Sequence, residues 1–289
     1  MNRQPYTIRE LETIEAYHQA EEAQREIWAI RDDTEVLPLH MMQTAHKNGG
    51  LALGAFDGRE RMIGFLFGFL GRTVAGRWKH CSHMMGVLPA WRRQGVGEAL
   101  KRYQRRFVLR QGLDLITWTF DPLEGVNATL NFGKLGVICR TYHRNLYGNM
   151  ADDLNRGLPS DRFEVEWWIA SRRVEERLRG EKSRPRLADF EGVGVQPVNR
   201  AETRGALLHP AAADLTADAP RLLVETPADF QAIKAASMEV ARAWRTHTRA
   251  IFEAYFQAGY TATEFFSEVT ATGRRNFYLL QRAAPAEER

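Results

Sequence analysis

The stretch from Val87 to Leu100 joins an apolar segment to an amphipathic one through a turn that holds two arginines and two glycines. Glycine lets the backbone come close to an anion because it carries no side chain. The first N–H groups of a helix have no partner within it, and the helix dipole is positive there. Arginine adds forked donors that suit phosphate oxygens. The stretch therefore predicts a strand, a turn and a helix that together could hold a phosphate group.

The hydrophobic pattern around this turn predicts helices and strands in mixed order. Strands are expected at residues 6–12, 51–56, 61–70, 79–87, 113–120, 137–142 and 163–170, and helices at 14–30, 37–48, 97–111 and 127–135. Asp57-Gly58 is a strong hairpin signal between two of the strands. The order contains one β-α-β crossover at the glycine turn, which predicts an α/β fold with a mixed sheet.

A charged, proline-containing stretch after residue 172 marks the expected boundary between two regions. We expect a first domain at residues 1–172 and a C-terminal α/β extension at 173–289 that packs on it. The extension is predicted to hold a strand at 222–225 and a long helical region that ends at Gly259, with a break near Ser237. Thr226 and Pro227 are expected to begin that region, with Thr226 as the cap. A hairpin around Gly273 follows.

Composition argues against several classes of protein. The formal net charge is +4, but the basic residues are scattered rather than gathered in a stripe, so we expect no nucleic-acid partner. No apolar run approaches the length of a membrane span, and the polar N-terminal stretch is not typical of a signal peptide. Cys81 and Cys139 are the two cysteines, which favours a reducing cytoplasm, and no cluster has the spacing of a metal site.

The element order and the motif Arg92-x-x-Gly95-x-Gly97 together resemble the GNAT superfamily, the Gcn5-related N-acetyltransferases. The resemblance covers residues 6–170, and Asn127 with Lys134-Leu135-Gly136 matches a later motif of that family. The segments 118–123 and 158–162 resemble signatures of a long branch of acyltransferases with a C-terminal extension. The resemblance implies the GNAT acyl-CoA acyltransferase fold, with acetyl-CoA or another acyl-CoA as co-substrate and no metal.

The same resemblance implies which residues contact CoA. They form the backbone of one strand end, the glycine turn and the later short helix, namely Met85, Gly86, Val87, Arg92, Arg93, Gln94, Gly95, Val96, Gly97, Glu98, Asn127, Asn131 and Phe132. Other readings of the turn fit less well. A Rossmann fingerprint needs a third glycine where this chain has Leu100, and a P-loop needs Gly-Lys-Ser/Thr. A tight turn with solvent-facing arginines remains the structural alternative.

The implied chemistry is direct attack of an amine on the thioester, which requires a general base. His83 is the first candidate because it lies four residues before Val87, so both share a face if no bulge intervenes. A buried core histidine is the alternative. Asp121, with Glu124, follows a strand and could bind an ammonium group or act as the base, or else Asp121 is only a turn residue before a proline.

One position departs from the family pattern. Phe132 stands where many members have a tyrosine that protonates the leaving thiolate. Tyr142 is a candidate replacement, with core packing as its alternative. Asp161 and Arg162 are expected to form a structural pair, although Arg162 could instead bind a substrate carboxylate.

The expected function is acyl-CoA-dependent N-acyltransfer, by default of acetyl, to the amine of a small molecule, with amino acids among the options. A non-catalytic acyl-CoA-binding module is the alternative function, because Phe132 has no proton to give. A nucleic-acid binder is a third hypothesis. The identity of the acceptor, the size of the acyl group and assembly as a homodimer are left open by the sequence.

Overall fold

The computed structural model describes residues 5–30, 32–150, 152, 155–180, 185–190, 194–270 and 273–282. The chain divides into two compact units, Met1–Trp118 and Thr119–Arg289, which we call the first and second units. The division falls within strand β5 (Leu115–Phe120). The boundary predicted between residues 172 and 173 is a different division, and it stays a prediction.

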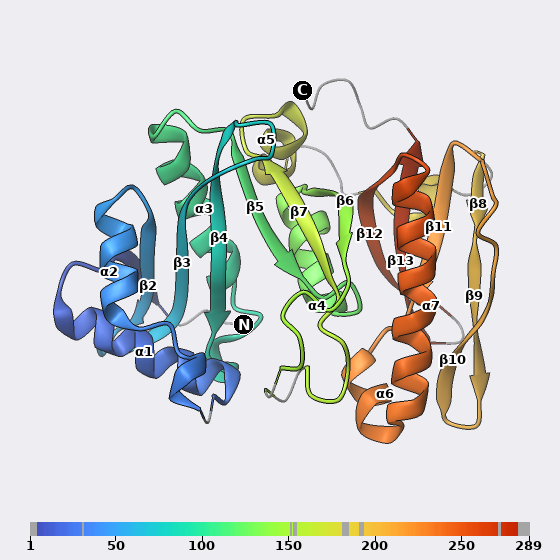
Figure 1. Cartoon of the computed structure of the whole chain (residues 1–289), viewed down its shortest axis with the longest axis horizontal. Coiled ribbons are helices and arrows are strands. Elements are labelled where there is room, and N and C mark those ends of the chain that lie inside the picture. The colour runs from blue at the N-terminus through green and yellow to red at the C-terminus, as the bar shows by residue number, and fades with distance from the viewer. Residues whose placement is uncertain are drawn as a thin grey trace. The chain divides into compact units, whose positions relative to one another are not determined.

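The first unit is a sheet with helices on both faces (Figure 1). Its strands run in the order β1-β2-β3-β4-β5, with β1 (Tyr6–Glu10), β2 (Leu51–Asp57), β3 (Met62–Arg72) and β4 (Trp78–Val87) before β5. Neighbouring strands are antiparallel except β4 and β5, which are parallel. The helices are α1 (Ile14–Trp28), α2 (Leu39–Lys47) and α3 (Val96–Arg110), with short 3₁₀ turns at Asp33–Glu35 and Pro89–Trp91.

Two glycines show which helix covers which face of this sheet. A Cβ on Gly86 would lie 2.4 Å from Cγ2 of Ile27 in α1, whereas a Cβ on Gly64 would lie 3.0 Å from Cγ1 of Val96 in α3. Gly64 pairs with Val87, the neighbour of Gly86 in β4, so α1 and α3 lie on opposite faces. The absence of a side chain at Gly86 is what lets α1 pack directly on β4.

The second unit contains a larger sheet and a separate two-stranded sheet. The larger one has the order β7-β6-β12-β13-β11-β8 and the smaller one pairs β9 with β10. The strands are β6 (Ile138–His143), β7 (Arg162–Trp168), β8 (Val195–Pro197), β9 (Asn199–Arg204), β10 (Leu207–Ala213), β11 (Arg221–Thr226), β12 (Tyr260–Thr270) and β13 (Gly273–Arg282). The helices are α4 (Gly125–Ala128), a π-helix at Thr129–Leu135, α5 (Arg172–Arg179), 3₁₀ turn Leu187–Phe190, α6 (Phe230–Ala236) and α7 (Met238–Gln257).

The predicted α/β class and mixed sheet are confirmed, and so is the break in the long helical region. Ser237 separates α6 from α7, and its side chain accepts a hydrogen bond from the N–H of Val240 at the start of α7. The predicted helix start is wrong. Thr226 is the last residue of β11, and Asp229 caps α6 by accepting from the N–H of Ala232. Both residue types are good N-caps, so the sequence alone does not show which of the two caps the helix.

No helix in the part of the chain that the structure describes is long and apolar enough to span a membrane.

Candidate functional site

Beyond Cys81, no described strand pairs with the edge of β4 that faces away from β3. Across all residues described, β4 pairs with β5 only at His80 with Ile116 and Cys81 with Thr117, yet β4 continues to Val87. The N–H of Leu88 donates to the carbonyl of Ile63 in β3, over 2.9 Å. Because polar groups alternate in direction along a strand, the N–H groups of Met85 and Val87 lie on the edge away from β3. An extended amide-containing chain could add there like another strand.

The turn after β4 leads directly into the N-terminus of α3. Gly95 is the N-cap, with φ of +92°, and it supplies no side chain to cap the helix. Arg93 also has a positive φ, of +64°. The first bond of the helix is from the N–H of Ala99 to the carbonyl of Gly95, so the N–H groups of Val96 and Gly97 have no partner within the helix. N–H groups without a partner in the helix attract anions, because the helix dipole is positive at this end.

The polar side chains of the turn have different tasks. Arg92 donates from Nε to the carbonyl of Val87 over 3.1 Å and from Nη2 to the carbonyl of Ile27 over 3.3 Å. Gln94 likewise donates to the carbonyl of Ala90, and Glu98 forms an ion pair with Arg102 at 2.9 Å. Arg92 and Arg93 are both exposed. Arg92 thus links the end of β4 to α1, and the expected contacts of Arg92, Arg93 and the other turn residues with CoA stay predictions.

His83 lies at a bulge in β4. Phe67 pairs with Met84 and Gly68 with Ser82, which leaves His83 without an opposite residue. The shared face expected for His83 and Val87 is therefore wrong. The His83 ring packs against Phe67 and Phe69, on the face away from α3, at centroid distances of 6.3 and 5.8 Å.

The side chain of His83 is exposed, so the core-histidine alternative is wrong as well. Partial desolvation lowers its pKa below the usual 6.5. The imidazole is thus neutral, and able to accept a proton, at neutral pH. Its role as general base stays a prediction.

A buried polar cluster connects α3 to β4 on the opposite face. Lys101 is fully buried, and its Nζ lies 2.8 Å from Oγ of Ser82, 3.2 Å from Oε1 of Gln104 and 3.5 Å from the ring centre of Trp118. Burial lowers the pKa of Lys101 well below its usual value. Burial and the nearby Lys101 together lower the pKa of His80 to about 3. Sequence reasoning missed this cluster, although a lysine within the apolar face of α3 was a visible signal.

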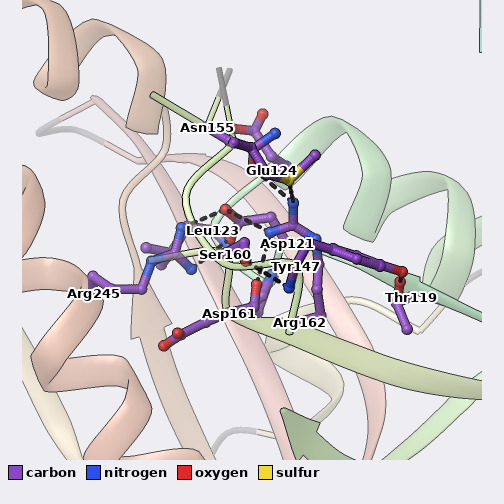
Figure 2. A network of polar contacts seen from close by, with 12 residues as sticks. Thr119, Asp121, Leu123, Glu124, Tyr147, Asn155, Ser160, Asp161, Arg162 and Arg245 are labelled. Carbon is purple, nitrogen blue, oxygen red and sulfur yellow. Dashed lines mark hydrogen bonds and ion pairs between the residues drawn. The ribbon is translucent and has the colours of Figure 1, made fainter. Parts of the chain in front are cut away.

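In the second unit, Asp121 belongs to a buried network of ion pairs (Figure 2). Its oxygens accept a forked pair of bonds from Arg245, one of them 2.8 Å long, and a bond from the N–H of Leu123 at 2.9 Å. Asp121 and Arg245 are 9% and 2% exposed. Asp121 is a turn residue, as one of the two predictions for it stated. Its carboxylate, which the other prediction gave to a substrate ammonium or to base catalysis, is bound to the guanidinium of Arg245. Its predicted part in catalysis is not supported by this arrangement and stays a prediction.

Tyr142 belongs to the same network through Asp161. Its hydroxyl donates to Oδ2 of Asp161 over 2.6 Å, and Arg249 donates to both oxygens of that carboxylate at 2.7 and 2.8 Å. Burial and the charge of Asp161 raise the pKa of Tyr142 far above its usual value, which makes it a poor proton donor. Burial also works to raise the pKa of Asp161, but bonds from Arg249 and Tyr142 outweigh it and lower that pKa. The expected Asp161–Arg162 pair forms only through the Asp161 carbonyl.

The later short helix is not the single α-helix that the sequence predicts. It starts as α4 and widens into the π-helix, which contains Asn131 and Phe132. Phe132 is fully buried, with its ring 5.5 Å from that of Tyr278 and 6.3 Å from that of Phe120. Asn131 is also buried, whereas Asn127 is exposed. The expected contacts of these three residues with CoA stay predictions.

Two charged residues of the second unit, Arg245 and Arg249, were missed from the sequence, and a third, Glu124, was a candidate for which no partner was predicted. Arg245 and Arg249 lie one turn apart on α7, and Glu124 follows β5. Arg245 stands beside Trp244 in the apolar stripe of that helix, and a charge in such a stripe is a signal of a buried ion pair. Burial raises the pKa of Glu124, whose Oε1 accepts a hydrogen bond from Gln231.

The part of the chain that the structure describes brings together no group of three or more His, Cys, Asp or Glu that could hold a metal ion.

Comparison with known proteins finds likenesses of structure. No profile of a known family matches the chain, and no curated protein matches it in sequence. Over part of its length the chain is similar in structure to many GNAT acetyltransferases. The ribosomal-protein-S18-alanine N-acetyltransferase of Escherichia coli is 17% identical, with 57% of this chain and 94% of that chain covered and a TM-score of 0.45.

Two other solved structures give similar values. A GNAT-family acetyltransferase from Streptococcus pneumoniae is 13% identical, with 56% of this chain and 98% of that chain covered and a TM-score of 0.45. Arabidopsis thaliana Naa50, in complex with a CoA-containing bisubstrate analogue, is 15% identical, with 56% and 97% covered and a TM-score of 0.44.

Proposed function

We propose that this protein is an acyl-CoA-dependent N-acyltransferase that acts on the amine of a small molecule, with acetyl as the default acyl group. The observation that carries the proposal is the continuity of the free β4 edge with the start of α3. The outward N–H groups of Met85 and Val87 suit the amides of a pantetheine arm, and the uncapped helix start at Gly95 suits a pyrophosphate. The two subsites are adjacent in the chain, which suits a single elongated ligand with a phosphate-containing part and an amide-containing part.

The chain's own residues would then perform three tasks. Arg92 keeps the end of β4 in place by binding the carbonyls of Val87 and Ile27. A backbone N–H of the β4 edge is available to stabilise the oxyanion as the amine attacks the thioester carbon. His83, neutral at the bulge, takes the proton that the attacking amine loses, and the thiolate leaves as the amide forms.

A non-catalytic acyl-CoA-binding module is the second candidate, because Phe132 is fully buried and has no proton to give. Calorimetric titration with acetyl-CoA, combined with thiol release in the presence of a panel of amines, separates the two. The proposal predicts saturable binding and amine-dependent release of thiol that His83→Ala lowers. Binding with no thiol release for any amine would favour the module, and absence of binding would refute both.

A further inference from the structure

The bulge at His83 separates two halves of β4 whose side chains alternate out of step. In the downstream half, Gly86 lies on the face that α1 covers, since a Cβ there would lie 2.4 Å from Cγ2 of Ile27. Strict alternation from Gly86 would put Ser82 on that same face. Ser82 instead points to the opposite face, where its Oγ lies 2.8 Å from Nζ of Lys101 in α3. The extra residue at the bulge accounts for the change of face.

The downstream half of β4 is held by close packing. Gly86 has no room for a side chain against Ile27, so a slip by one residue would bring a larger neighbour into that contact. The N–H of Leu88 also donates to the carbonyl of Ile63 over 2.9 Å. These contacts fix the register of the half that carries the outward N–H groups.

The upstream half of β4 is held by a buried polar contact next to the bulge. Nζ of Lys101 donates to Oγ of Ser82 over 2.8 Å and to Oε1 of Gln104 over 3.2 Å, and Oγ of Ser82 donates to the same Oε1 over 3.2 Å. Ser82, Lys101 and Gln104 are 4%, 1% and 0% exposed. A buried polar group that loses its partners costs stability, so these bonds oppose any slip that would turn Ser82 away from α3.

His83 lies where the two fixed halves meet. Ser82 and Met84, on either side of it, both pair with residues of β3, whereas His83 has no opposite residue. Its imidazole lies on the face away from α3, against Phe67 and Phe69. Without the bulge, alternation along the downstream half would turn His83 toward α3.

We propose that Ser82, bound to Lys101 and Gln104, is a positioning residue that fixes the bulge of β4 and so keeps His83 on the face away from α3, where it acts as the base. The inference rests on the proposed function for the role of His83. The packing of Gly86 and the bonds of Ser82 require side-chain directions that a strand without a bulge does not satisfy. Ser82 is buried, and it acts on His83 through the backbone that joins them.

The test removes the hydroxyl of Ser82 and follows His83 directly. Nuclear Overhauser contacts between the ring of His83 and those of Phe67 and Phe69 are measured by NMR in the full chain, together with thiol release from acetyl-CoA. Ser82→Ala is expected to weaken or remove these contacts and to lower kcat by about 10- to 100-fold, the loss expected for a misplaced catalytic group. The affinity for acetyl-CoA should stay that of the wild-type chain, because the downstream half keeps its packing.

Three further variants separate this role from a general loss of stability. Ser82→Thr keeps the hydroxyl and should retain the contacts of His83 and most of kcat, whereas Lys101→Met removes the 2.8 Å bond and should act like Ser82→Ala. Val108→Ala is the matched control, because Val108 is a fully buried residue of α3 outside the polar cluster. It should lower the stability in urea denaturation and leave His83 in place.

Contacts of His83 that persist in both Ser82→Ala and Lys101→Met would overturn the inference, and so would an unchanged kcat in a variant that has lost them. If no amine releases thiol with the wild-type chain, the proposed function fails, and the contacts alone decide whether Ser82 fixes the bulge. Their loss in Ser82→Ala but not in Val108→Ala would support that role, and equal loss in both variants would refute it.

Discussion

Replacement of Gly95 by alanine tests the anion site at the start of α3. Gly95 has φ of +92°, a conformation that an L-residue adopts at a cost of about 1–2 kcal/mol. Alanine is expected to lower the free energy of unfolding by that amount, or to relieve the strain by rotating the backbone. Rotation would turn the N–H groups at the helix start away from a phosphate. The loss of one bond to a charged group predicts acetyl-CoA binding weaker by about 10-fold, measured by calorimetry.

Gly112 provides the matched control for this change. It follows the other end of α3, has φ of +73°, and a Cβ there would meet nothing within 4 Å. Gly112→Ala should therefore cost a similar free energy of unfolding in urea denaturation but leave acetyl-CoA binding unchanged. The reasoning is refuted if Gly95→Ala loses stability as Gly112→Ala does and still binds acetyl-CoA with wild-type affinity.

Three further changes have outcomes that the structure specifies. Asp121→Asn or Arg245→Met alone should lower the free energy of unfolding by about 3–5 kcal/mol, because each leaves a buried charge unpaired, and the double variant should lose less than the sum. Additive losses in urea denaturation would contradict a coupled pair. Lys101→Met should flatten the pH dependence of stability. The pKa of Lys101 is lowered in the fold, so the unfolded chain binds an extra proton and stability rises with pH toward the usual 10.5. An unchanged slope between pH 7 and 10 in the variant would show that the burial argument is wrong. If His83 is the base, its lowered pKa keeps it active down to below pH 6.5. The fall of kcat/KM on acidification should then disappear in His83→Ala, and a fall that persists in this variant would assign the base elsewhere.

The strand-turn-helix unit was predictable because its signals are local. An apolar run, two glycines and an amphipathic run determine β4, the turn and α3 within one residue of the predicted bounds. The hairpin at Asp57-Gly58 was predictable for the same reason. The start of α6 was less predictable, because Thr226 and Asp229 are both good capping residues and lie only three positions apart. Thr226 pairs with Asn276 in the sheet, so Asp229 is the cap.

The side-chain networks were beyond the sequence because they depend on distant partners. Asp121 and Arg245 are 124 positions apart, so no local pattern relates them. The bulge at His83 depends on how β3 pairs with β4, and one extra residue there moves His83 to the other face from the one that simple alternation predicts. The bond from Arg92 to the carbonyl of Ile27 crosses 65 positions of the chain, so no local pattern indicates it, and the contact of Arg92 with phosphate stays a prediction.

A crystal structure of the chain with acetyl-CoA tests the central claim most directly. The account predicts the pyrophosphate within hydrogen-bond distance of the N–H groups that follow Gly95, and the pantetheine amides paired with Met85 and Val87 along the free edge of β4. Acetyl-CoA bound away from β4 and the start of α3 would contradict it.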